Sequence, residues 1–248
     1  MSQNATGIFV SQTGNSIING LLSGMAWDGP VTYGFPSSAS DYPADYPSSP
    51  QTKEFSALNA TQSDAVRIIL DTAPSSSARG AFSVEGFTNL DFSEVAGASA
   101  DIRVANSGDA NPTAYAYYPG AGNGGDTFFG TNANNEYNAP AVGKYAYATF
   151  LHELGHSLGL NHGHEVDAYP NGSTAPALPT IFDSMEYSIM TYRSFGGSDP
   201  TSGYSNGPGD YAQTFMMADI ATLQHMYGAD FTANGGDTTY RWTPGSGV

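Results

Sequence analysis

Apolar residues recur at helical spacing in several parts of the chain. Between Thr61 and Thr72 they fall three and four positions apart, which predicts a helix with one buried face and Thr61 as its N-cap. A second helix is expected over residues 144–158. A third is expected from about Thr214 to a stop at Gly228, because four apolar residues repeat at the same spacing: Met217, Ile220, Leu223 and Tyr227.

Short stretches with strand-like composition lie before the first expected helix and between the first two. Strands are expected at residues 31–35, 89–92, 101–105, 114–118 and 126–129. Leu90 and Phe92 alternate with polar neighbours, as do Ile102 and Val104, so these strands should be half-buried. Residues 36–52 are rich in Pro and Ser and predict an irregular surface loop. The chain has little regular pattern between His162 and Thr214.

Composition narrows the function classes. The 248 residues contain 23 Asp and Glu but only seven Lys and Arg, for a formal charge of −16, so nucleic acid and anionic membrane surfaces are not expected partners. No apolar run is long enough to span a membrane, and residues 1–14 lack the basic and apolar regions of a standard signal peptide. There is no cysteine, so thiolate metal ligands and disulfides are excluded.

The chemistry is concentrated between Tyr145 and His162, which read YAYATFLHELGHSLGLNH. His152 and His156 lie about one helical turn apart, so both imidazoles project from one face of the predicted helix. Gly159 can adopt positive φ, end the helix and turn the chain back, so that His162 approaches the same point. Three imidazoles and one exchangeable position are typical of a catalytic zinc site.

Glu153 follows the first expected ligand directly. Its carboxylate would lie beside the open position of the metal, where it can take a proton from a bound water instead of acting as a ligand. We therefore expect Glu153 to be the catalytic base, which then passes the proton to the leaving amine. The alternative is that the three histidines only stabilise the fold and bind no metal. It is disfavoured because four of the five histidines fall between residues 152 and 164.

The pattern H-E-x-x-H-x-x-G-x-x-H followed by a Met-turn is the metzincin signature. Residues 188–192, SIMTY, resemble the Met-turn of one metzincin branch, the serralysin family of secreted bacterial zinc proteases. Further segments resemble serralysin catalytic domains: NSIINGLLSGMAWDGPVTYGFP, AYAYYPG and MADIATLQHMYGADFTANGGDTTYRW. One departure is Gly163, where many serralysins have proline after the third histidine.

The resemblance implies a fold and further site residues. It implies an α+β metzincin fold in a single domain, with residues 1–159 as a sheet-and-helix upper lobe and residues 160–248 as an irregular lower lobe closed by the C-terminal helix. Met190 would form an apolar floor beneath the zinc, and Tyr192 would be a further ligand that swings away to stabilise the tetrahedral intermediate. Segment 114–118 would be the edge strand that pairs with an extended peptide.

The resemblance also implies a setting. The expected protein is a monomeric endopeptidase, secreted without an N-terminal signal peptide, that acts on protein substrates and can be blocked by a small protein inhibitor. Residues 235–242, GGDTTYRW, resemble the approach to calcium-binding repeats, but no complete repeat is present, so the chain is either a catalytic-domain fragment or a short member. The sequence does not decide whether this chain binds calcium, because its acidic residues are scattered and not grouped in a loop motif.

Two other function classes remain. A zinc-containing binding or adhesion module would need the same three histidines but would have no use for Glu153 and Tyr192 together. A zinc hydrolase that is not a protease could share HExxH alone, but the Gly turn, the third histidine and the Met-turn argue against it. His164 lies near the motif without a spacing argument, and His225 on the C-terminal helix is expected to be structural or exposed.

Overall fold

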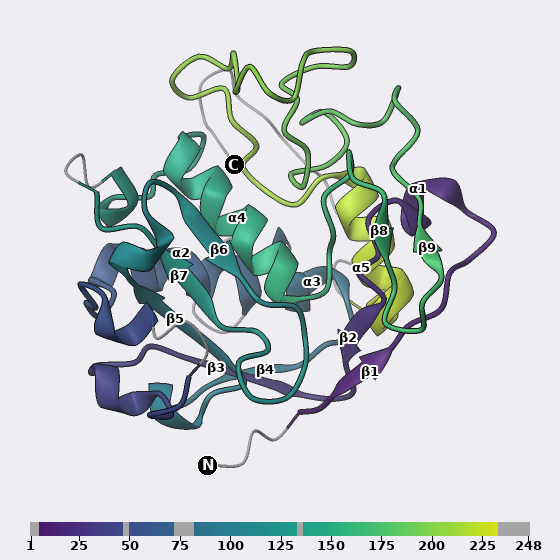
Figure 1. Ribbon diagram of the computed structural model, residues 1–248. Coiled ribbons are helices and arrows are strands. Elements are labelled where there is room, and N and C mark those ends of the chain that lie inside the picture. Colours follow the sequence, from purple (N-terminus) through teal and green to yellow (C-terminus); the bar gives the residue numbers. More distant parts are fainter. Residues whose placement is uncertain (1–4, 47–49, 72–81, 133–135, 233–248) are drawn as a thin grey trace.

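The computed structural model describes residues 5–46, 50–71, 82–132 and 136–232. Its centre is a five-stranded sheet in the order β4-β3-β5-β7-β6 (Figure 1). The strands are β3 (Val31–Gly34), β4 (Phe92–Glu94), β5 (Ile102–Asn106), β6 (Ala114–Ala116) and β7 (Thr127–Phe129). All neighbours pair in parallel except β6, which is antiparallel to β7 and lies at the edge. The expected edge position of segment 114–118 is confirmed.

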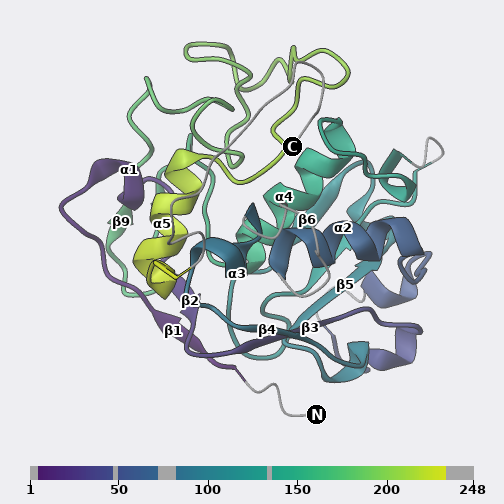
Figure 2. The same cartoon turned by 180° about the vertical axis from the view of Figure 1, so that it is seen from behind.

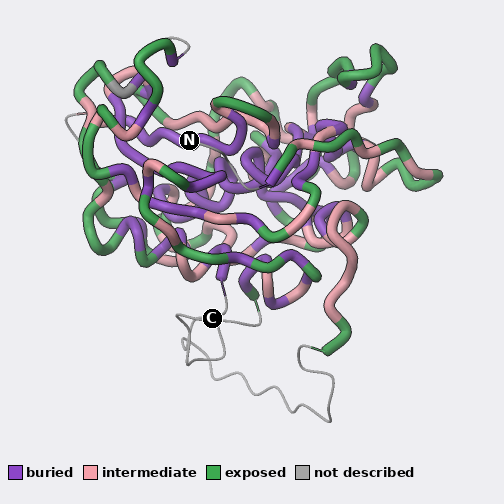
Figure 3. Tube along the Cα trace, turned by 90° about the horizontal axis from the view of Figure 1, so that it is seen from below, coloured by how far each residue is buried: buried purple, intermediate pink, exposed green. Residues whose placement is uncertain are grey.

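Two helices, α2 (Ala60–Leu70) and α4 (Tyr145–Ser157), lie side by side and contact each other, and α4 also packs on β6 and β7 (Figures 1 and 2). The ring of Phe129 in β7 stacks on that of Phe150 in α4, with centroids 3.8 Å apart. Apolar side chains from both helices and the sheet share one core, and buried segments gather in the middle of the molecule (Figure 3). The core therefore fixes α4 against the edge strand.

The opposite face of the sheet is also covered, which corrects two expectations. Segment 36–52 forms two short 3-10 helices, η1 (Ala39–Asp41) and η2 (Pro50–Thr52), and buries Tyr42 and Tyr46 against Phe128 instead of lying wholly on the surface. Strand β5 is consequently buried at every position and not half-buried. Arg103 in this strand is satisfied by two hydrogen bonds of 2.7 Å to Asp126.

Two predicted boundaries are wrong. Helix α2 begins at Ala60 with Asn59, not Thr61, as its N-cap: Asn59 accepts from the Gln62 amide, and the Gln62 side chain accepts from the Asn59 amide. Thr72, the expected end, lies outside the described residues. The strand expected at 89–92 begins only at Phe92, because the Asn89 amide donates to the carbonyl of Gly228 and this segment packs on the end of α5.

The chain from Leu158 to Met216 contains little regular structure, as expected: the described strands there are β8 (Asp167–Ala168) and β9 (Thr174–Ala175). Helix α5 (Met217–Tyr227) begins three residues after the expected start at Thr214, and it ends at Gly228, whose φ is 80°, so the predicted stop is confirmed. The remaining elements are β1 (Gly7–Phe9), α1 (Ser16–Asn19), β2 (Met25–Trp27), α3 (Val84–Phe87), η4 (Gly97–Ser99), η5 (Gly108–Ala110) and η6 (Glu136–Asn138).

Helix α1 packs on α5, and β1 pairs with β2 in a small antiparallel sheet beside them (Figure 1). Segment 235–242, which resembles the approach to repeats, lies outside the described residues. None of the helices that the structure describes combines the length and apolarity needed to cross a bilayer. A mixed sheet with helices α2 and α4, followed by a long irregular segment and α5, is the α+β architecture that the sequence predicts.

Candidate metal centre

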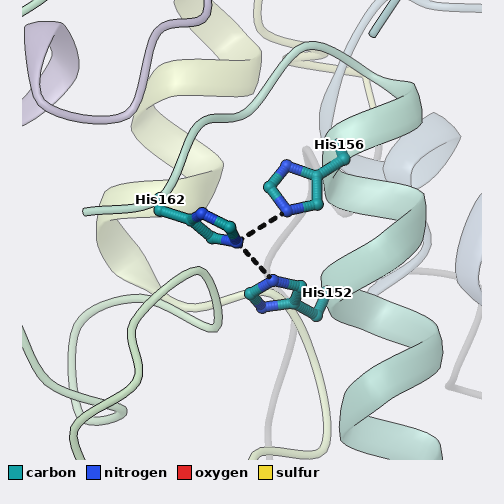
Figure 4. Close-up of side chains that lie close together, drawn as sticks. All are labelled: His152, His156 and His162. Atoms are coloured by element: carbon teal, nitrogen blue, oxygen red, sulfur yellow. Dashed lines mark hydrogen bonds between the residues drawn. The ribbon is translucent and has the colours of Figure 1, made fainter. Parts of the chain in front are cut away.

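The three motif histidines meet at one point (Figure 4). His152 and His156 project from the same side of α4, and His162 reaches them from the segment that follows the helix. The Nε2 atom of His162 lies 3.1 Å from Nε2 of His152 and 3.0 Å from Nε2 of His156. Across the described parts of the chain, no other group of three or more His, Cys, Asp or Glu brings its ligand atoms together in this way.

The outer nitrogen of each ring shows which tautomer is present. Nδ1 of His152 lies 2.9 Å from the carbonyl oxygen of Ile189, and Nδ1 of His156 lies 2.8 Å from that of Leu160. A carbonyl oxygen only accepts, so each Nδ1 carries the proton and each Nε2 presents a lone pair. Nδ1 of His162 donates to the carboxylate of Glu165 at 3.0 Å.

The three Nε2 lone pairs face one point within 4.8 Å of one another and have no proton to share, so the centre is built for a cation. Burial, and then the neighbouring His162, lowers the pKa of His152 to about 3, and burial lowers the pKa of His156 and of His162 as well. The rings are therefore neutral near pH 7, which is the form that binds a metal. Three neutral imidazoles fit a zinc ion with one open position.

The turn at Gly159 brings His162 back to the helix. Gly159 has φ of 96°, which confirms the expected positive φ, and a Cβ there would lie 2.1 Å from the Met25 carbonyl oxygen. The end of α4 is anchored by two side chains: the indole of Trp27 donates to the carbonyl of Ser157, and the hydroxyl of Tyr227 donates to that of Leu158. These contacts hold the turn against β2 and α5.

Met190 lies fully buried beneath the helix, as expected for an apolar floor. A Cβ on Gly155 of α4 would lie 2.6 Å from the Met190 sulfur, so a larger residue at 155 would force either the Met190 side chain or the helix to shift. The amide of Gly163 donates to the Met190 carbonyl at 3.2 Å. Proline has no amide proton, so glycine at 163 gives this chain a link between the third histidine and the Met-turn that proline could not supply.

Asp219 organises the Met-turn and was not anticipated from the sequence. Its buried carboxylate accepts from the Ser188 hydroxyl at 2.6 Å, from the Ile189 amide at 2.8 Å and from the Met216 amide at 2.9 Å. Burial raises the pKa of Asp219 to about 6 against the effect of these donors. The available signal was a lone acidic residue in the first turn of a helix that is otherwise mostly apolar. Through Ile189, this carboxylate also supports the carbonyl that holds His152.

Glu153 and Tyr192 lie at the centre as the sequence predicts. Glu153 is buried, with 6% of its surface exposed, and its Oε2 has no hydrogen-bond partner among the described residues. Burial raises the pKa of Glu153 to about 8. The Tyr192 hydroxyl lies 3.0 Å from Nε2 of His162, so it points at the same place as the histidines. Burial, and then the charge of Glu153, raises the pKa of Tyr192 to about 12.

Two cavities meet at these residues. One, of about 410 Å³, is lined largely by apolar and aromatic side chains, including Tyr145, Met185 and Tyr204. The other, of about 310 Å³, runs along β6 toward Glu165. Four residues border both cavities: Ala114 of β6, His152, Glu153 and Tyr192. The reactive groups therefore lie between two hollows beside an open strand edge.

The two remaining histidines differ. The ring of His164 lies 4.6 Å from that of Tyr192 and 5.4 Å from that of His162, so it belongs to the surroundings of the centre without being one of the converging ligands. His225 is exposed on α5, which agrees with the expected surface position.

Comparison with known proteins adds family evidence to this geometry. Residues 59–172 match the matrixin family, which is zinc-dependent. Serralysin C of Dickeya chrysanthemi is 36% identical over 135 residues, or 53% of this chain and 27% of the relative. Metallopeptidase AprA of Pseudomonas marginalis is 34% identical over 57% of this chain and 30% of the relative, and serralysin G of Dickeya chrysanthemi is 29% identical over 88% and 43%. The chain thus matches less than half of each relative's length.

The histidine centre, the sheet with its antiparallel edge strand and the matrixin match over residues 59–172 all agree with the expected metzincin architecture. The chain is also similar to serralysins of Dickeya chrysanthemi and Proteus mirabilis, with matches that span 53% to 77% of its length.

Proposed function

We propose that this chain is the catalytic domain of a secreted zinc endopeptidase that cleaves peptide bonds within protein substrates. The observation that supports this most is the placement of Glu153 and three converging imidazoles between two cavities. A chain that runs along β6 can extend into both cavities, so its scissile bond would lie in the interior of the substrate and not at an end. The open edge of β6 offers main-chain hydrogen bonds to such an extended segment.

His152, His156 and His162 would hold the zinc, with Tyr192 as an additional ligand at rest. When bound, zinc polarises the scissile carbonyl and lowers the pKa of a water molecule toward about 7. Glu153 accepts a proton from that water as its oxygen attacks the carbonyl carbon. Glu153 then delivers the proton to the amide nitrogen as the C–N bond breaks, and the second proton of the water also passes to the new amine, so that the products are a carboxylate and an ammonium group. The Tyr192 hydroxyl donates a hydrogen bond to the oxygen that develops negative charge.

The cavity beside Tyr145 and Tyr204 supports an apolar side chain next to the cleaved bond, because its lining is largely apolar and the hydroxyl of Tyr204 is occupied by the carbonyl of Thr191. We further propose that the domain divides near Gly159 into an upper and a lower lobe and that the protein is a monomer. We also propose that a small protein inhibits it by inserting a terminus between the two cavities.

The test is cleavage of labelled casein by the purified chain and by Glu153→Ala, with zinc content measured for both. The wild type should cut, and the variant should keep its zinc but lose most turnover, because only the proton acceptor is removed. Glu136→Ala, which removes an exposed carboxylate outside both cavities, is the matched control and should cut normally. A zinc-loaded wild type that does not cut would favour the binding-module alternative, and an active Glu153→Ala would refute the assigned base.

A further inference from the structure

The third histidine is held differently from the other two. Nδ1 of His152 and Nδ1 of His156 donate to main-chain carbonyls, which no substitution can remove. Nδ1 of His162 donates instead to Oε2 of Glu165, three residues further on. Among the three rings, therefore, only that of His162 depends on another side chain for its outer hydrogen bond.

We propose that Glu165 is a positioning residue that fixes the ring of His162 and thereby sets the affinity of the centre for zinc; this rests on the proposed zinc function. The carboxylate binds the ring nitrogen opposite to the one that faces the centre, so Glu165 is not itself a ligand. A hydrogen bond to a charged acceptor is shorter and stronger than one to a neutral carbonyl, and it makes the imidazole a better donor to a metal.

The main chain of His162 is fixed independently of Glu165. The His162 amide donates to the side-chain oxygen of Asn161 at 2.8 Å, and the hydroxyl of Tyr118 donates to the same oxygen at 2.7 Å. The next residue, Gly163, donates to the carbonyl of Met190. Loss of Glu165 should therefore free the ring to rotate while leaving the backbone in place.

Exposure separates this role from a structural one. The side chain of Glu165 is 45% exposed, and its Oε1 lies 3.7 Å from Nε2 of His164, which is beyond hydrogen-bond distance. Among the described residues, the contact with His162 is thus the one hydrogen bond of the Glu165 side chain, and this side chain contributes little to the core. Its removal should change metal affinity far more than the stability of the metal-free protein.

Three variants of the full chain test the proposal: Glu165→Ala, Glu165→Gln and Asp167→Asn. The zinc dissociation constant is measured by competition with a chromophoric chelator, and unfolding of each metal-free protein is followed in parallel. Glu165→Ala should weaken zinc binding by about 10- to 100-fold, the usual effect of losing a partner that orients a ligand. Glu165→Gln should weaken it less, because the amide oxygen still accepts from Nδ1 but carries no charge.

Asp167→Asn is the charge control. Asp167 also acts on His162 through its charge but makes no described hydrogen bond to the ring, so this variant should bind zinc nearly as the wild type does. A second readout needs no metal: ¹⁵N chemical shifts should show His162 of the metal-free wild type as the Nδ1–H tautomer and a mixture of tautomers in Glu165→Ala.

Each result decides something. Wild-type affinity in Glu165→Ala, or an equal loss in Asp167→Asn, overturns the proposed role of Glu165 while leaving the zinc function intact. Parallel loss of metal-free stability in Glu165→Ala would make the residue structural and would also overturn it. A wild type that binds no zinc removes the proposed function and this inference together.

Discussion

Replacing Gly159 with alanine tests the turn that delivers the third histidine. Two costs are expected. A residue with a Cβ at φ of 96° loses about 1 to 2 kcal/mol relative to glycine. The new Cβ would also lie 2.1 Å from the carbonyl oxygen of Met25, which belongs to the main chain of β2 and cannot rotate away, so the backbone must move at a cost of about 1 to 3 kcal/mol.

The sum, roughly 2 to 5 kcal/mol, is a large part of the roughly 5 to 15 kcal/mol that stabilises an ordinary domain. Urea unfolding of the metal-free protein measures how much unfolding free energy Gly159→Ala loses relative to the wild type. Gly172→Ala is the matched control, because Gly172 has φ of 80° but no atom within 4 Å of an added Cβ, so it should show the conformational cost alone. The reasoning is refuted if Gly159→Ala is no more destabilising than Gly172→Ala, since the close approach to Met25 would then carry no energy.

Three further predictions concern the centre and its support. Tyr192→Phe should keep zinc but lower casein cleavage by about 10²-fold, the usual loss of one donor to an oxyanion, and an unchanged rate would exclude that role. His156→Ala should lose both zinc and activity, and phenanthroline should abolish wild-type activity until zinc is restored; activity that survives the chelator would contradict a metal mechanism. Asp219 has a pKa raised by burial from 3.8 to about 6, so the folded state binds its proton more tightly than the unfolded state does. Its contribution to the unfolding free energy should fall by on the order of 2 to 3 kcal/mol as pH rises from about 4 to 6.5. The difference between wild type and Asp219→Asn measures this change, and a difference that grows with pH would mean that the three hydrogen bonds outweigh burial.

Much of the fold follows from local patterns. The helix of the motif and α5 lie close to where the sequence predicts them, the first from the spacing of the motif and the second from the spacing of its apolar residues, and a glycine follows the end of each. The N-cap of α2 was predicted wrongly, although Asn59 and Gln62 carry the side chains of a capping box and could have been chosen. The side chains next to the helix start were therefore sufficient to identify its N-cap from the sequence.

Other features depend on contacts far apart in the sequence. Tyr42 and Tyr46 lie in a segment with the composition of a surface loop, yet they pack on Phe128 and cover one face of the sheet. The roles of Asp219 and Glu165 depend on which donors the fold brings to their carboxylates, and spacing alone does not reveal these donors. The convergence of the three motif histidines, in contrast, was predictable because one helix and one turn determine it.

The cavity of about 410 Å³ beside the reactive groups is lined by residues from two different parts of the chain. Tyr145, Ala148 and Thr149 come from α4, whereas Met185, Thr201 and Tyr204 come from the long irregular segment. A mutation in the second wall can reshape the cavity while the helix that carries His152 and Glu153 keeps its packing. Natural variation in that segment could therefore change which peptides are accepted while the reaction itself is inherited intact.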